Sequence, residues 1–159
     1  MSRLQPPYQY VIDSSALFDL KNNYPVRIFP GLWERFNDMW GQKQIVSTRE
    51  VLREILRGND ELNDWSKEYE ENFLEPCEDE MELLNEVIQL YPPHILQKIG
   101  TSVWADPFVV SCAKYYALPI IQHEVVDANQ FKIPPIAKKM GVKCMRLIEF
   151  FEDEGWQFE

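Results

Sequence analysis

The residues of this chain best suited to chemistry are acids at points where predicted strands end or predicted helices begin. Asp13 closes an apolar strand, and Glu124 follows another. Asp106 opens an apolar helix. The helix after the second strand carries Glu50 and Glu54, and we expect one of the two to join the other acids. In an open parallel sheet, ligands bind outside the carboxyl ends of the strands. We therefore expect these carboxylates to meet in one crevice if their strands are neighbours.

Carboxylates that share a crevice indicate a bound cation. They repel one another and raise one another's pKa values unless a cation holds them. Hard divalent ions such as Mg²⁺ are bound by a few carboxylates together with waters and substrate phosphates. Such an ion activates water and stabilises the charge of an in-line phosphoryl displacement. The set of acids therefore predicts a metal-dependent nuclease.

Each acid taken singly also has an ordinary structural interpretation. Asp13 alone is a typical cap or turn residue. Glu54 lies beside Arg53 and is suited to ion pairing on a solvated helix face. Asp106 precedes Pro107, which is the pattern of an N-cap followed by proline at the first helical position. The prediction of a metal site therefore depends on the whole set.

Alternating strands and helices must position these acids. Apolar runs predict four strands, at 8–12, 43–47, 118–122 and 142–146. Helical spacing, caps and stop signals predict helices at 16–21, 30–41, 49–58, 61–73, 79–90, 103–117, 132–141 and 147–155. Ser47 and Glu50 form a capping-box pattern before the third of these helices. The alternation with short links predicts a parallel sheet flanked by helices.

Composition excludes several classes of protein. A chain of 159 residues fits one domain, and 45% hydrophobic residues are ordinary for a globular protein. No apolar run approaches the roughly 20 residues that span a bilayer, and the first residues do not form a signal peptide. Three scattered cysteines without a C-x-x-C pair argue against a disulfide framework or a zinc site. We expect free thiols in a reducing cytoplasm.

The negative charge of the chain is concentrated in one segment. The net charge is −10, and residues 59–86 hold twelve acids and one lysine. We interpret residues 59–90 as an acidic helical insert on a near-neutral body. It suits a basic partner, or it is a solvated pair of helices. Its aromatic residues Trp65, Tyr69 and Phe73 fit either an interface or core packing at a spacing of four.

Three motifs in order resemble those of the PIN domain superfamily. The segment YVIDSSALFDL resembles the opening of PIN domains, in which the first strand ends in Asp and a small polar pair follows. STREVLREI resembles the second motif, with its acid at Glu54, and VWADPFVVSCA resembles the third, with its acid at Asp106. The C-terminal half is similar to an uncharacterised bacterial branch of PIN-like proteins.

The resemblance implies a single PIN-like domain over residues 1–159. Its fold would be a three-layer α/β/α sandwich with a central parallel sheet of four to five strands. Its activity would be that of a metal-dependent endoribonuclease using Mg²⁺ or Mn²⁺. Many bacterial members are toxins of toxin–antitoxin pairs, so an antitoxin is the implied protein partner. Homodimers are common among such relatives.

The implied metal ligands and catalytic residues are Asp13, Glu54, Asp106 and Glu124. Many PIN domains have a T-x-D pattern after the strand that corresponds to 118–122, where this chain has Gln-His-Glu. The fourth acid is therefore either Glu124 or Asp127.

Basic and small polar residues near these acids are candidates for substrate binding. Ser15 matches the small polar position after the first Asp and is suited to contact a metal-bound water or a phosphate. Arg53 and Lys132 are candidates for phosphate contacts, with ordinary surface positions as the alternative.

Two other functions remain open from the sequence. One is phosphotransfer with Asp13 as nucleophile, although a dehalogenase-like phosphatase would want an Asp at the position of Ser15. The other is a catalytically inactive PIN-like module that binds RNA or protein.

Overall fold

Five short parallel strands form the centre of the structure. The computed structural model describes residues 6–58, 61–99, 104–124 and 132–158. The sheet has the order β3-β2-β1-β4-β5, and every neighbouring pair is parallel. The strands are β1 (Tyr10–Ile12), β2 (Ile45–Thr48), β3 (Phe73–Leu74), β4 (Ile120–Ile121) and β5 (Cys144–Met145).

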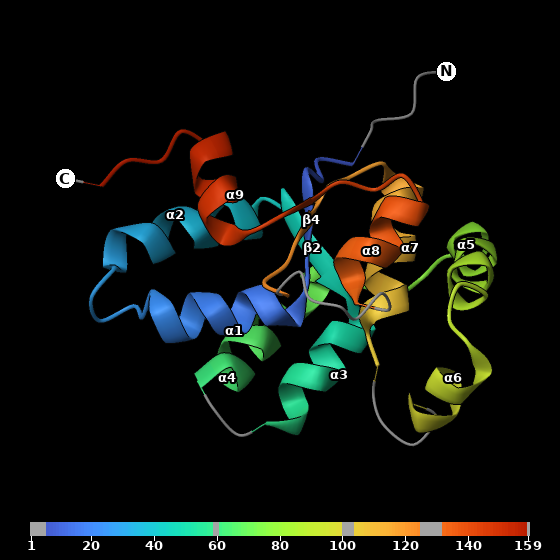
Figure 1. Ribbon diagram of the computed structural model, residues 1–159. Coiled ribbons are helices and arrows are strands. Elements are labelled where there is room, and N and C mark those ends of the chain that lie inside the picture. The colour runs from blue at the N-terminus through green and yellow to red at the C-terminus, as the bar shows by residue number, and fades with distance from the viewer. Residues whose placement is uncertain (1–5, 59–60, 100–103, 125–131, 159) are drawn as a thin grey trace.

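Helices cover the sheet on both sides (Figure 1). Helix α7 packs on β1, β2 and β4, and α5 and α8 pack against α7, whereas α1, α2 and α9 lie on the opposite side of the sheet. The helices are α1 (Ser14–Asn23), α2 (Pro30–Gly41), α3 (Arg49–Arg57), α4 (Glu61–Glu68), α5 (Glu78–Ile88), α6 (Pro93–Ile99), α7 (Asp106–Tyr116), α8 (Ile133–Lys139) and α9 (Leu147–Asp153). The prediction of a three-layer α/β/α sandwich around a parallel sheet of four to five strands is therefore confirmed.

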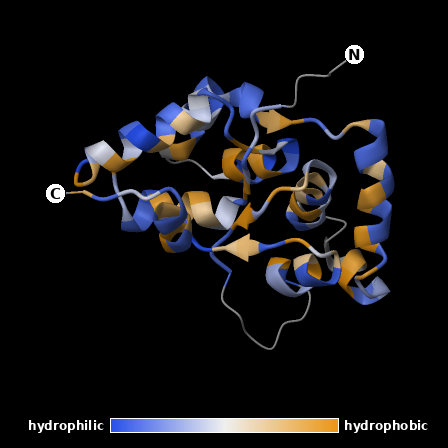
Figure 2. Ribbon diagram, turned by 90° about the horizontal axis from the view of Figure 1, so that it is seen from above, coloured by the Kyte–Doolittle hydropathy of each residue, from blue (hydrophilic) through white to orange (hydrophobic). Residues whose placement is uncertain are grey.

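The order of the strands creates a switch point beside β1. The chain passes from β1 to β2 and β3 on one side, and then crosses to β4 on the other side of β1. Val11 pairs with Val46 of β2 and with Ile120 of β4, so β1 is the central strand. Its residues are all buried, which explains the unbroken apolar run. The hydrophobic colour of the central strands is visible in Figure 2.

The acidic segment contributes a strand that the sequence analysis did not predict. The helix expected over 61–73 ends as α4 at Glu68, and a 3₁₀ turn (Glu70–Asn72) leads into β3. Phe73 is fully buried and lies edge-on to Trp40, with 5.4 Å between the ring centroids. Burial of this ring against α2 therefore prevails over the helical tendency of the acidic run around it.

The aromatic residues of the acidic segment pack in or against the core. Trp65 packs on Trp40 with 4.9 Å between the ring centroids, and Tyr69 packs on Trp65 at 5.5 Å. Phe73 therefore lies in the core, and Trp65 and Tyr69 pack against the core while remaining partly exposed.

The capping residue of α3 differs by one position from the prediction. Thr48 is the N-cap, because its Oγ1 accepts the hydrogen bond from the Val51 amide at 3.3 Å. Ser47 instead belongs to β2, and its Oγ donates to the Ile12 carbonyl at 2.6 Å. The predicted capping box at Ser47 and Glu50 is thus wrong. Ser47 fixes the end of β1 next to Asp13.

Asn72 joins the acidic segment to the sheet, and its replacement by alanine should destabilise the fold. Its buried Nδ2 donates to the carbonyls of Trp40, at 2.5 Å, and Ile45, at 3.0 Å. Asn72→Ala leaves both acceptors without this donor, which should lower the free energy of unfolding by about 1–3 kcal/mol. Urea denaturation would measure the loss. The exposed Asn85 on α5 provides the matched control, and equal stability of both variants would contradict this role of Asn72.

Within the described part of the chain, none of the helices has the length and apolar character needed to cross a membrane.

Candidate metal centre

Three carboxylates meet at the switch point of the sheet. Asp13 follows β1 directly, Glu124 lies just beyond β4, and Asp106 is the first residue of α7. One oxygen of each residue lies within 4.8 Å of an oxygen of each of the others. The neighbouring positions of β1 and β4 bring the first two together, as expected for acids at the carboxyl ends of adjacent parallel strands.

Asp13 is both a helix cap and a member of this cluster. Its side chain is buried, and its Oδ2 accepts hydrogen bonds from the Ser15 amide at 3.2 Å and from the Ser15 hydroxyl at 2.7 Å. Its Oδ1 is also buried but has no hydrogen-bond partner among the described residues. The capping interpretation therefore accounts for one oxygen, and the other remains available to a ligand. Burial raises the pKa of Asp13, against the lowering effect of the Ser15 hydrogen bonds.

Asp106 is not the cap of its helix. Ala105 occupies the N-cap position, so Asp106 and Pro107 are the first two residues of α7, one position later than predicted. Burial raises the pKa of Asp106 to about 9, and the charges of Asp13, Glu124 and Glu54 add to this effect. A side-chain hydrogen bond with Trp104 acts in the opposite direction.

Glu54 borders the cluster from α3. Burial is the main cause that raises the pKa of Glu54 to about 7, and the charge of Asp13 adds to it. A hydrogen bond with the Ala105 backbone lowers the pKa of Glu54. Its Oε1 is buried without a hydrogen-bond partner in the described structure. The expected pairing of Glu54 with Arg53 is not found, since Arg53 forms its ion pair with Glu50. Glu54 lies outside the compact set of three carboxylates but is close enough to interact electrostatically with them.

Glu124 is held at the start of α8. Its Oε2 accepts a hydrogen bond from the Ile133 amide at 2.7 Å, and its own amide donates to Gln122 Oε1 at 2.6 Å. These contacts orient a carboxylate that follows a short strand. The other candidate for the fourth acid, Asp127, lies outside the described residues.

The cluster offers a set of carboxylate oxygens as ligands. Oxygen ligands of this kind suit Mg²⁺ and Mn²⁺, and the buried orphan oxygens of Asp13 and Glu54 have unmet bonding capacity. Burial, together with the charges of Glu124 and Asp13, raises the pKa of the Cys144 thiol to about 12. Cys144 is therefore a neutral thiol near the cluster in the metal-free protein at physiological pH.

The residues predicted to bind substrate have different surroundings. The Ser15 hydroxyl donates to Asp13 and accepts from the His123 amide at 3.0 Å, so it links β1 to the end of β4. Arg53 is exposed and paired with Glu50. Lys132 is half-buried at the N-cap of α8.

Sequence reasoning missed two groups near the cluster. Tyr91 is buried, packs edge-on against Trp104 at 4.5 Å, and has its pKa raised by burial and by the charges of Asp106 and Glu124. Arg146 follows β5 and lies beside His123. Its position after a predicted strand is visible in the sequence, whereas its place beside His123 depends on the pairing of β4 with β5.

Comparisons with known proteins place the chain in a family. A family model described as a domain of unknown function (DUF4411) matches residues 10–158. The chain belongs to this family. A comparison with curated proteins finds no match. The part shared with the DUF4411 family extends from β1 to beyond α9, and it includes all three clustered acids as well as Glu54.

Proposed function

We propose that this chain is a metal-dependent ribonuclease whose centre is formed by Asp13, Asp106 and Glu124. The observation that carries the proposal is the approach of their carboxylate oxygens to within 4.8 Å of one another at the switch point of the sheet. Carboxylates at this separation repel one another, and a divalent cation offsets that repulsion. Mg²⁺ or Mn²⁺ fits a donor set made only of oxygens.

The chain's own groups then have distinct roles. When bound, the metal supplies an activated water and stabilises charge on a phosphodiester group. Asp13, Asp106 and Glu124 hold the cation, while Ser15 and the start of α8 keep Asp13 and Glu124 in place. In this proposal the buried Oε1 of Glu54 accepts a proton from water at the centre.

The choice of RNA as substrate rests on the resemblance of the three acid motifs to those of PIN domains. On the same ground we propose that the chain acts in the cytoplasm as the toxin of a toxin–antitoxin pair and that a small antitoxin protein is its partner.

Cleavage of RNA by matched variants tests the proposed activity. Mixed single-stranded RNA would be incubated with EDTA-treated protein, with and without Mn²⁺. We expect cleavage only with the metal, and a loss of at least about 100-fold in Asp106→Asn, as for the removal of a central catalytic group. Glu50→Gln is the control, since Glu50 lies one turn from Glu54 and is paired with Arg53.

The outcomes separate three interpretations. Equal cleavage by Asp106→Asn and the parent would contradict the assignment of the centre. Metal-independent cleavage would contradict the mechanism. Binding of RNA without cleavage under any metal would favour the inactive binding module.

A further inference from the structure

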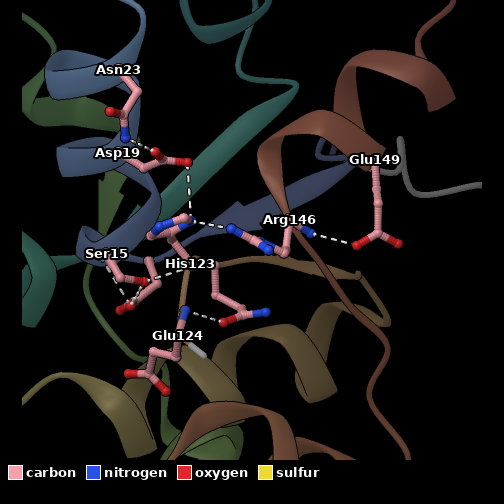
Figure 3. A network of polar contacts seen from close by, with 9 residues as sticks. Ser15, Asp19, Asn23, His123, Glu124, Arg146 and Glu149 are labelled. Atoms are coloured by element: carbon pink, nitrogen blue, oxygen red, sulfur yellow. Dashed lines mark hydrogen bonds and ion pairs between the residues drawn. The ribbon is translucent and has the colours of Figure 1, made fainter. Parts of the chain in front are cut away.

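A second polar cluster lies on the other side of His123 from Glu124. His123 Nδ1 is 3.1 Å from Asp19 Oδ2 of α1 and 3.2 Å from an Arg146 guanidinium nitrogen. Figure 3 shows the His123 ring between Asp19 and Arg146. The cluster thus combines residues from α1, the end of β4 and the end of β5.

The two contacts of His123 Nδ1 cannot both be hydrogen bonds. Arg146 can only donate and the carboxylate of Asp19 can only accept, so Nδ1 either donates to Asp19 or accepts from Arg146. Asp19 is nearly buried, with 9% of its side chain exposed, and its other oxygen accepts from Asn23 Nδ2 at 2.5 Å. A lone pair on Nδ1 would face this fixed carboxylate. We therefore assign the Nδ1 proton to the bond with Asp19.

This assignment leaves the guanidinium of Arg146 available to another acceptor. Arg146 is exposed, and its backbone is fixed by a hydrogen bond from its amide to Glu149 Oε1 at 3.1 Å. Within the described ranges, no carboxylate lies at salt-bridge distance from its guanidinium. Arg146 also lines a surface pocket of about 280 Å³ together with Asp19, Asn23, Tyr24 and His123.

The pocket is tied to the metal centre through the end of β4. The His123 amide donates to Ser15 Oγ, and Ser15 Oγ donates to Asp13 Oδ2. The next residue after His123 is Glu124. Arg146 therefore lies beside the residue that immediately precedes Glu124, at the strand end that borders the metal centre.

We propose that Arg146 binds a backbone phosphate of single-stranded RNA beside the phosphate at the metal centre. The inference rests on the proposed function and adds a positioning residue to it. A guanidinium presents paired donors that match phosphate oxygens. Because His123 Nδ1 donates to Asp19, this nitrogen offers no acceptor to the Arg146 guanidinium. This proposal adds Arg146 to Arg53 and Lys132, the two residues for which the sequence predicts phosphate contacts.

The role of Arg146 predicts a change in RNA binding without a change in metal binding. Arg146→Ala should weaken binding of a labelled single-stranded RNA about tenfold, as for the loss of one charge-assisted contact. The slope of log Kd against log salt concentration should fall by about 0.7, the value for one phosphate contact on a single strand. In cleavage, KM should rise while kcat changes little, because Arg146 does not touch the reacting atoms.

Fluorescence anisotropy in Ca²⁺, with a gel to confirm that the RNA is intact, would measure binding. Arg146→Lys should recover part of the affinity, since it restores the charge but not the paired donors. Arg27→Ala is the control, because Arg27 is an exposed arginine between α1 and α2. Mn²⁺ binding should be equal in all four proteins.

The results distinguish failure of this inference from failure of the proposed function. If Arg146→Ala binds RNA with the parent's affinity and salt dependence, while the parent cleaves RNA with metal, the role of Arg146 alone is wrong. If the parent neither binds nor cleaves RNA, the proposed function is wrong and the inference fails with it. Loss of Mn²⁺ binding in Arg146→Ala would show that Arg146 supports the metal centre instead.

Discussion

Asp106→Asn should make the metal-free protein more stable at pH 8 while removing its response to Mn²⁺. Asp106 is crowded by the charges of Asp13, Glu124 and Glu54, and its pKa is raised to about 9. At pH 8 the folded protein therefore keeps Asp106 largely protonated, whereas the unfolded chain ionises it, and this difference lowers the stability of the parent. Asparagine is nearly isosteric and neutral in both states, so it avoids this cost. The gain should be on the order of 1–3 kcal/mol, the usual cost of a buried polar group that lacks its partner.

Thermal unfolding in EDTA and in Mn²⁺ would measure both effects. In EDTA the variant should unfold at a higher temperature than the parent, and in Mn²⁺ the order should reverse. Glu50→Gln removes an acid that is paired with Arg53 and that contributes only the smallest of the charge effects on Glu54, so it should show a smaller gain in EDTA than Asp106→Asn and a normal response to Mn²⁺. A variant less stable than the parent in EDTA would mean that the Asp106 carboxylate stabilises the fold by itself.

The stability of the parent should fall with rising pH when no metal is present, and Mn²⁺ should oppose that fall. The folded-state pKa of Glu54 is raised from 4.5 to about 7, and that of Asp106 from 3.8 to about 9. The folded protein therefore binds more protons than the unfolded chain over this range. The contribution of these acids is fully present below about pH 4 and is lost as the pH rises through 7 and 9.

The stabilisation by bound Mn²⁺ should instead increase with pH, unlike the stability of the metal-free protein. The ligands must be deprotonated to bind a cation, so the stabilisation by Mn²⁺ should grow from pH 5 to pH 9. At a metal concentration of about 100 times Kd it should approach about 2.7 kcal/mol. For a chain of this size that corresponds to a rise in Tm of roughly 5–10 °C.

Unfolding curves in EDTA and in Mn²⁺ across this pH range would test the linkage. The difference between the two conditions is the informative quantity, because the buried Glu80 also has a pKa raised to about 7 by burial. Glu80 titrates in both conditions and cancels in the difference. A difference that stays constant from pH 5 to pH 9 would contradict binding by titrating carboxylates.

Most of the sheet could be predicted from the sequence because β1 and β4 are wholly apolar and β2 begins with two apolar residues. Each of the four runs that predicted strands overlaps one, although β2 extends one residue beyond its run and β4 and β5 are only two residues long. The fifth strand could not be predicted in this way. Phe73 and Leu74 lie within a run of acids, and their extended conformation depends on pairing with Ser47 and Thr48 and on burial against Trp40. Such contacts between distant residues leave little local signal.

The candidate site, like the sheet, could be predicted only in part from the sequence. The convergence of Asp13 and Glu124 follows from a general property of parallel sheets, and it needed only that β1 and β4 be neighbours. The position of Arg146 could not be weighed in the same way. Its proximity to His123 depends on the pairing of β5 with β4 and on the packing of α1, which places Asp19 against the His123 ring. A single sequence does not reveal these contacts.

The most direct test of the central claim is a titration of EDTA-treated protein with Mn²⁺, followed by electron paramagnetic resonance of the free ion. The account predicts one bound Mn²⁺ per chain, lost in Asp106→Asn and retained in Glu50→Gln. Equal binding by the parent and Asp106→Asn, or no binding by the parent, would contradict a metal centre formed by Asp13, Asp106 and Glu124.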